Sequence, residues 1–159
     1  MGSRSKLDLA YIAGFLDGDG SLMLQVKLRS DTSRGVRFMA TLCLYQDTRH
    51  EDPLLWVREI LGIGYISHRN DGMTELRING FASIQKVLVQ LRPFIRFKIV
   101  QADALLQACT LLKLKKIREL SEQELRTLVE LVFVIRNNNY KSNATLSKEV
   151  LLDRLGLTP

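Results

Sequence analysis

Two stretches near the start of the chain alternate between apolar and polar residues, and they constrain the fold more than any other feature. Residues 22–28 carry an aliphatic side chain at every second position, and residues 38–44 repeat the pattern with apolar side chains after a turn at residues 30–35. A period of two places successive side chains on opposite faces of a β-strand. The stretches therefore predict a β-hairpin with one buried face and one polar face.

The remaining segments predict a second hairpin and a set of helices. Strands are expected at residues 65–69 and 73–78, on either side of the turn-forming sequence Asn70-Asp71-Gly72. Helices are expected at 7–18, between Asp52 and Gly62, at 84–91, from after Pro93 to about Lys113, from Ser121 to about Arg136, and from about Ser147 to Leu155. This order predicts an α+β fold, α-β-β-α-β-β-α, whose antiparallel four-stranded sheet is covered by helices on one face.

Neither a linker nor an internal repeat divides the 159 residues. We expect one domain over residues 1–159, with a core at about 7–112 and a helical tail at about 113–159. Cys43 and Cys109 are too few and too far apart for a disulfide framework. They indicate an intracellular, reducing compartment, and leave open whether it is an organelle or a prokaryotic cytoplasm.

The net charge of +6, with a sequence pI of about 9.5, suits a polyanionic partner. Basic residues gather on the polar side of the predicted strands, at Lys27, Arg29, Arg37, Arg69 and Arg77. A solvated strand face is the plain alternative. A membrane partner is not expected, because the cations lie on strands and no apolar run reaches the ~18 residues of a membrane span.

The segment Tyr11–Ser21 places two carboxylates and three glycines where the first helix passes into the first strand. Carboxylates at a helix C-terminus lie beside its free carbonyl groups, at the unfavourable end of the helix dipole. A divalent cation relieves both, and the Asp19 carboxylate and Gly18 carbonyl are oxygen ligands that Mg²⁺ accepts. The alternative is an ordinary Asp-Gly turn in which Asp17 braces the helix end.

Small residues recur along the same helix at Ala10, Gly14 and Gly18. Such a row lets a second helix backbone approach closely. The partner helix could be internal, but a symmetric homodimer would bring two copies of Asp19 to one central point. We therefore expect a dimer interface that includes Ala10, Ala13, Gly14, Asp17 and Gly18.

With these features in place, Tyr11–Gly20 resembles the signature of the LAGLIDADG homing endonucleases, in the single-motif, homodimeric branch. The element order, the sequence Gly62-Ile63-Gly64-Tyr65 and residues 91–98 followed by Gln101-Ala102 are similar to that branch too. The resemblance covers residues 7–112 well and the tail loosely. It implies a homing-endonuclease fold with a saddle-shaped sheet over the major groove. It also implies a double-strand DNA endonuclease, intron-encoded, with a long near-palindromic target.

The resemblance also implies functional residues. Asp19 and the Gly18 carbonyl would bind the catalytic metal, expected to be Mg²⁺, with Mn²⁺ or Ca²⁺ able to occupy the site, and Asp17 would be structural. Gln46 would orient the attacking water, while Lys98 would stabilise developing charge or lower the pKa of that water. Without the resemblance, Lys98 would be interpreted as a phosphate-neutralising or solvated cation, and Gln46 as an amide at the end of a strand. Strict alternation sends Gln46 to the apolar face, so its role requires a bulge or a strand end.

Double-stranded DNA is the expected partner. Base contacts are expected from Gln25, Lys27, Arg29, Arg37, Thr41, Ser67, Arg69, Glu75 and Arg77. Phosphate contacts are expected from Lys113, Lys115, Lys116, Asn139, Lys141 and Asn143. Two alternatives stay open: a maturase-like protein of the same fold that binds intron RNA, and a non-catalytic DNA-binding regulator.

Overall fold

The computed structural model describes residues 5–32, 34–140 and 145–158. Its strands are β1 (Gly20–Leu28), β2 (Val36–Asp47), β3 (Tyr65–His68) and β4 (Met73–Asn79). Its α-helices are α1 (Lys6–Asp19), α2 (Asp52–Leu61), α3 (Phe81–Leu91), α4 (Ile99–Leu114), α5 (Glu122–Asn138) and α6 (Lys148–Arg154). Short 3-10 turns occur at η1 (Thr48–His50), η2 (Arg92–Phe94) and η3 (Ile117–Glu119). The predicted α+β order is confirmed.

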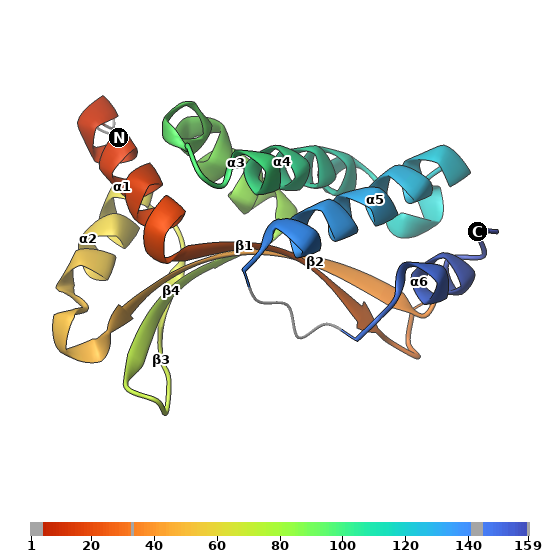
Figure 1. Ribbon diagram of the computed structural model, residues 1–159, viewed down its shortest axis with the longest axis horizontal. Helices are drawn as coiled ribbons and strands as arrows, with labels where there is room; N and C mark the ends of the chain where they lie inside the picture. Colours follow the sequence, from red (N-terminus) through yellow and green to blue (C-terminus); the bar gives the residue numbers. More distant parts are fainter. Residues whose placement is uncertain (1–4, 33, 141–144, 159) are drawn as a thin grey trace.

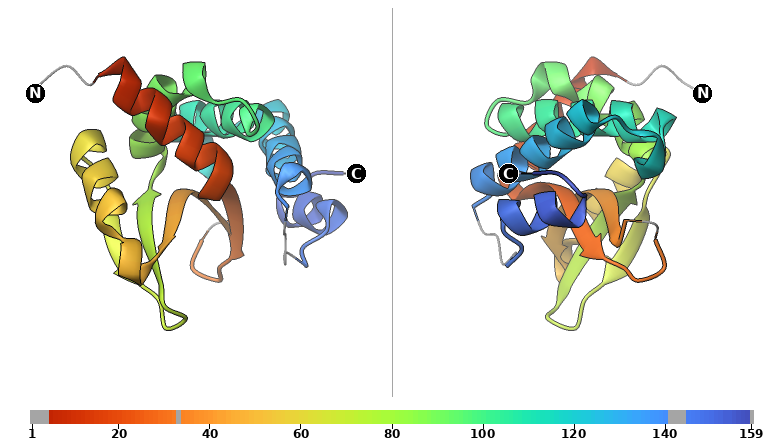
Figure 2. Two further views of the ribbon diagram at one scale, coloured as in Figure 1. Left: turned by 60° about the vertical axis from the view of Figure 1, so that its left-hand side comes forward. Right: turned by 90° about the vertical axis from the view of Figure 1, so that its right-hand side faces the viewer.

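The four strands form one antiparallel sheet in the order β1-β2-β4-β3. Helices α1, α3, α4 and α5 lie over one face of this sheet, while the sheet arches and leaves its concave face uncovered (Figure 1). Figure 2 shows the same arch from two further sides: the tip of the β3–β4 hairpin extends away from the helices, whereas the β1–β2 hairpin ends beside α6. The expected arrangement, with helices on one face only, is therefore correct.

The apolar alternation becomes the buried face of the sheet. Leu22 of β1 pairs with Leu42 of β2, and Leu42 pairs with Ile78 of β4, so the three side chains form one row across the sheet. All three are at most 1% exposed. Burial of such rows against the helices is the main source of stability, at roughly 25 cal/mol per Å² of apolar surface.

The passage from α1 into β1 depends on Gly20. A Cβ placed on this residue would lie 2.5–2.9 Å from atoms of Leu16, two of them backbone atoms. Any other residue would therefore push the first strand away from the helix. This tight junction fixes the position of residues 17–19, here called the acidic turn, relative to the sheet.

The tail closes onto the hairpin of β1 and β2. The Asn139 side chain donates to the Leu22 carbonyl at 3.1 Å, and Arg34 at the hairpin tip donates to the Leu155 carbonyl at 2.8 Å. The packing of α5 against β1 agrees with both contacts. Within the described ranges, none of the helices has the length and apolar character that a membrane span requires.

Candidate functional site

Asp17 and Asp19, the two acidic residues at the end of α1, have opposite environments. Asp17 is 7% exposed, and its carboxylate accepts three successive backbone N–H groups, those of Arg96 (2.6 Å), Phe97 (3.2 Å) and Lys98 (3.0 Å). Three such donors occupy both carboxylate oxygens. Asp17 therefore braces α1 against the segment before α4, the structural role expected for it.

Lys98 lies directly behind this brace. It is 5% exposed, and its ammonium donates a hydrogen bond to the main-chain oxygen of Asp17. Burial lowers the pKa of Lys98 from its ordinary value, while the charges of Asp17 and Asp19 act in the opposite direction. The Lys98 Nζ also lies 5.9 Å from the centre of the Tyr140 ring. Lys98 is therefore a cation held in a fixed position, and it lies close enough to Asp19 for the two charges to interact.

Asp19 is the last residue of α1 and is exposed. In the described part of the chain no cation forms a salt bridge with it, and no three His, Cys, Asp or Glu side chains converge on one point. One carboxylate beside helix-end carbonyl groups is a partial set of hard oxygen ligands, which suits Mg²⁺ or Ca²⁺. The set fits a metal that takes its remaining ligands from water, phosphate or a second protein chain.

Gln46 lies near the end of β2, on the same side of the sheet as α1. Gly20 pairs with Leu44, so β2 continues three residues past the start of β1 and carries Gln46, the second of the three, alongside the end of α1. The pairing with β4 is uninterrupted through Asp47, so there is no bulge, and the required strand end is present instead. The Gln46 Oε1 accepts the Asp47 N–H at 2.9 Å, which directs the amide nitrogen away from its own backbone.

The row of small residues on α1 faces outward. Gly14 and Gly18 are exposed, and a Cβ built on either meets no atom within 4 Å. Neither glycine is therefore needed for packing inside the described part of the chain. Two other residues expected at a dimer interface differ: Ala13 is 0% exposed and Asp17 forms the internal brace, so both are committed to the core of this chain. Ala10 is half-buried.

The predicted base-reading residues of β1, β2 and β4 share the uncovered face of the sheet. Lys27 is paired with Arg37 across β1 and β2, and Gln25 lies two residues nearer the acidic turn. On the other hairpin, Ser67 is paired with Glu75, and Tyr65 with Arg77. The strand pairing places these side chains together on the concave face.

Two of the expected base contacts are buried, against expectation. Thr41 is 1% exposed and donates to the Asn79 side chain at 2.9 Å. Glu75 is 6% exposed, and its two carboxylate oxygens accept from Arg69 at 3.1 Å and from Arg77 at 3.0 Å. A period of two gives the face on which a residue lies but not whether its neighbours cover it. In this conformation Glu75 holds two guanidinium groups in place instead of presenting a free carboxylate.

The expected phosphate contacts fall into three groups. Lys113 donates to Gln85 on α3 at 3.0 Å, and Lys115 pairs with Glu124 on α5 at 2.7 Å, so both are bound to the helical layer. The Asn139 side chain is already engaged in its hydrogen bond to the Leu22 carbonyl of β1. Lys116 is exposed, while Lys141 and Asn143 lie outside the described residues.

Sequence reasoning missed Tyr140, which contacts Lys98 from the end of α5 and is 88% exposed. It also missed the hydrogen bond at 3.0 Å between Ser21 and Tyr45 on the concave face. The Ser21–Tyr45 contact follows from the hairpin register, since Ser21 pairs with Cys43 beside Tyr45. No sequence signal places Tyr140 near Lys98, because the end of α5 is brought there only by tertiary packing.

The fold is that of the homing endonucleases. It matches a crystal structure of I-CvuI in complex with its target with a TM-score of 0.82 and 29% identity, over 97% of this chain and 98% of that one. The archaeal intron-encoded homing endonuclease I-Vdi141I, in complex with DNA, gives a TM-score of 0.84 over 94% of this chain and 95% of that one. At 21% identity that second likeness shows the fold alone.

The chain belongs to the LAGLIDADG endonuclease family, whose sequence model matches residues 12–92, about half of the chain. It is similar to DNA endonuclease I-CvuI of Chlorella vulgaris, with 36% identity over 104 residues. That match spans 65% of each protein, slightly less than two thirds of the relative. It is also similar to DNA endonuclease I-CreI of Chlamydomonas reinhardtii, with 25% identity over 92% of this chain and 90% of that protein.

Proposed function

We propose that this protein is a site-specific homing endonuclease, intron-encoded, that cuts both strands of a long near-palindromic DNA target as a homodimer. The observation that carries the proposal is the arrangement at the end of α1. There an exposed Asp19 is held in place by the internal brace of Asp17, beside the buried cation of Lys98. This arrangement combines a free oxygen ligand and a fixed positive charge, both of which metal-assisted phosphodiester hydrolysis can use.

The homodimer rests on the exposed faces of Gly14 and Gly18, which have no packing role within the described chain. A second α1 lying along this row would bury it and would place two Asp19 carboxylates on either side of one axis. Two strands of DNA crossing that axis would each meet one carboxylate. A dimer therefore supplies what one chain lacks, a second set of ligands and a second cutting centre.

When bound, Mg²⁺ would be held by Asp19 and the Gly18 carbonyl, and it supplies Lewis acidity and an activated water. Water attacks phosphorus, the bond to the leaving oxygen breaks, and the negative charge of the transition state spreads over the phosphate oxygens. Lys98, fixed by its hydrogen bond to Asp17, is the protein cation available to stabilise that charge. Gln46 has its carbonyl oxygen occupied, so its NH₂ group is free to donate to the oxygen of a water molecule.

Target recognition would use the concave face of the sheet in the major groove. Arg77 and Arg69 are held by the Glu75 carboxylate with their guanidinium groups on this face. An arginine fork that is fixed in this way reads guanine through its O6 and N7 atoms, which gives about 1–3 kcal/mol of discrimination per base. Gln25, Lys27 and Arg37 extend the same surface along the first hairpin.

The proposal is tested by incubating the protein with a plasmid library, with and without Mg²⁺. Each insert is palindromic, with one randomised half-site of about nine base pairs followed by its inverted repeat, so that the library can contain every such sequence. We expect linear plasmid only with the metal, and one palindromic sequence with its near relatives among the cut molecules. Mn²⁺ and Ca²⁺ are tried in parallel because either can occupy such a site. If no member of the library is linearised with any of these metals and the protein binds intron RNA tightly, the result would favour a maturase-like role and contradict the proposed nuclease activity.

A further inference from the structure

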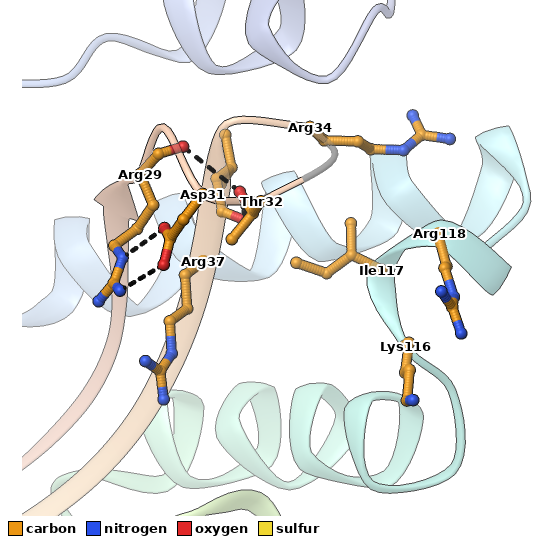
Figure 3. Close-up of a pocket in the computed structure, with 9 residues that line it drawn as sticks. Arg29, Asp31, Thr32, Arg34, Arg37, Lys116, Ile117 and Arg118 are labelled. Atoms are coloured by element: carbon orange, nitrogen blue, oxygen red, sulfur yellow. Dashed lines mark hydrogen bonds and ion pairs between the residues drawn. The ribbon is translucent and has the colours of Figure 1, made fainter.

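A pocket of about 380 Å³ lies between the tip of the first hairpin and η3, at the far end of β1 from the acidic turn (Figure 3). Arg29 and Arg37 come from the hairpin, while Lys116 and Arg118 come from the segment around η3. Nine residues line the pocket, of which five are basic and one, Asp31, is acidic, so the pocket carries a strong positive charge.

Only part of this charge is neutralised within the described residues. Arg29 forms a bidentate ion pair with Asp31, at 2.8 and 2.6 Å, which lowers the pKa of Asp31 to about 2. Arg34 donates to the Leu155 carbonyl at 2.8 Å. In the described part of the chain, no carboxylate forms a salt bridge with Arg37, Lys116 or Arg118, and all three are exposed. Lys116 and Arg118, which the proposed base-reading surface does not use, are therefore available to an anion.

The position of the pocket relates it to the proposed function. β1 runs nine residues from Gly20 to Leu28, and Leu28 pairs with Val36 of the pocket wall. At ~3.3 Å per residue the pocket lies about 30 Å along the sheet from the acidic turn. A DNA strand advances about 3.4 Å per nucleotide, so this corresponds to about nine base pairs from the centre of the target. That is the outer end of the segment that the hairpin can read.

We infer that this pocket binds backbone phosphates of the DNA that flanks the outer end of each half-site. The inference rests on the proposed function and extends it, since it adds Arg118 to Lys116, an expected phosphate contact, and assigns both to the DNA backbone beyond the bases read by the sheet. Exposed arginine and lysine without acidic partners are the usual donors to phosphate oxygens. The pocket joins two segments more than 75 residues apart in sequence, and the Lys116 N–H donates to the Glu119 side chain at 2.7 Å, which orders the wall at η3.

The test measures binding to two duplexes that carry the insert selected for cleavage. One duplex ends at the outermost selected base pair, and the other extends six base pairs further on each side. We expect wild-type protein to bind the extended duplex roughly tenfold more tightly, and Arg118→Ala and Lys116→Ala each to lose most of that preference. On the extended duplex, the slope of log K against log salt concentration should become shallower by about 0.9 for each phosphate that a variant no longer binds.

Lys86→Ala is the matched control, because Lys86 is an exposed cation on α3 outside the proposed surface. It should keep the full preference for the extended duplex. Two results would contradict phosphate binding by this pocket while leaving the nuclease proposal intact: an equal loss of affinity for both duplexes in Arg118→Ala, or a wild type that shows no preference for the extended duplex. If the nuclease proposal itself is wrong, no insert is selected for cleavage, and that failure is seen before either duplex is made.

Discussion

Asp17 and Lys98 hold each other through two different hydrogen bonds. The Asp17 carboxylate accepts the Lys98 backbone N–H at 3.0 Å, while the Lys98 ammonium donates to the Asp17 main-chain oxygen. The same carboxylate also binds the backbone N–H groups of Arg96 and Phe97. One acidic side chain thereby orders both a helix end and the only buried lysine of the described residues.

Asp17→Ala should destabilise the protein by roughly 3 kcal/mol or more, because three backbone donors lose a charged acceptor in a buried place. The measurement is urea unfolding followed by circular dichroism. Asp19→Ala is the matched control, since Asp19 is exposed and should change the free energy of unfolding little. Similar free energies of unfolding for the two variants would contradict the stabilising role of the Asp17 carboxylate.

Asp19→Asn should abolish cleavage while leaving DNA binding largely intact. The amide keeps the size of the side chain but removes the charge of the proposed metal ligand. Cleavage is followed by conversion of supercoiled to linear plasmid, and binding by fluorescence anisotropy in Ca²⁺. Retained cleavage in Mg²⁺ would exclude Asp19 as the metal ligand.

Lys98 should give the free energy of unfolding a characteristic pH dependence. Burial lowers its pKa in the folded chain below the ordinary 10.5. Between that lowered pKa and 10.5 the unfolded chain binds more protons than the folded chain, so stability rises with pH through this window and keeps its lower value on the acid side. Lys98→Met removes this contribution. We expect the stability difference, wild type minus variant, to increase as the pH rises toward 10.5, and a difference that does not change with pH would contradict this effect of Lys98 burial.

Glu75→Gln should relax base discrimination. The carboxylate that orients Arg77 becomes a neutral amide with one oxygen acceptor, so the Arg77 guanidinium group gains freedom, while Arg69 keeps its ion pair with Asp71 at 2.8 Å. We expect roughly a tenfold loss of discrimination at the base pair beneath Arg77. The measurement is competition binding against single base-pair variants of the target. Glu59→Gln, at an exposed position on α2, should leave discrimination unchanged.

Gly14→Leu should separate folding from dimer formation. A side chain at this position meets no other atom of the described chain, and replacing glycine inside a helix gains up to about 1 kcal/mol. The variant should remain folded but sediment as a monomer and fail to cleave. The control is Ala82→Leu on α3, also at an exposed helical position. A dimeric, active Gly14→Leu would exclude the proposed interface.

Local sequence signals predicted the elements well, because periodicity, turns and caps act over a few residues. The two hairpins, the helix order and the face of each strand residue are all found in the structure. What failed depends on neighbours from distant segments. Glu75 and Thr41 lie on the expected face but are covered, and Ala13 lies on the expected helix but faces inward. The Tyr140 contact with Lys98 has no local signal at all.

The strand order has a consequence for how copies of this chain associate. β1 and β3 form the two edges of the sheet, where unpaired backbone groups invite strand addition and aggregation. The Asn139 side chain binds the Leu22 carbonyl on the first edge, and the second edge is only four residues long and ends at His68. With both edges blunted in these ways, growth of the sheet from one molecule to the next is disfavoured. The proposed contact along the exposed row of α1 would instead be closed, because a two-fold pair leaves no copy of that row free for a third chain.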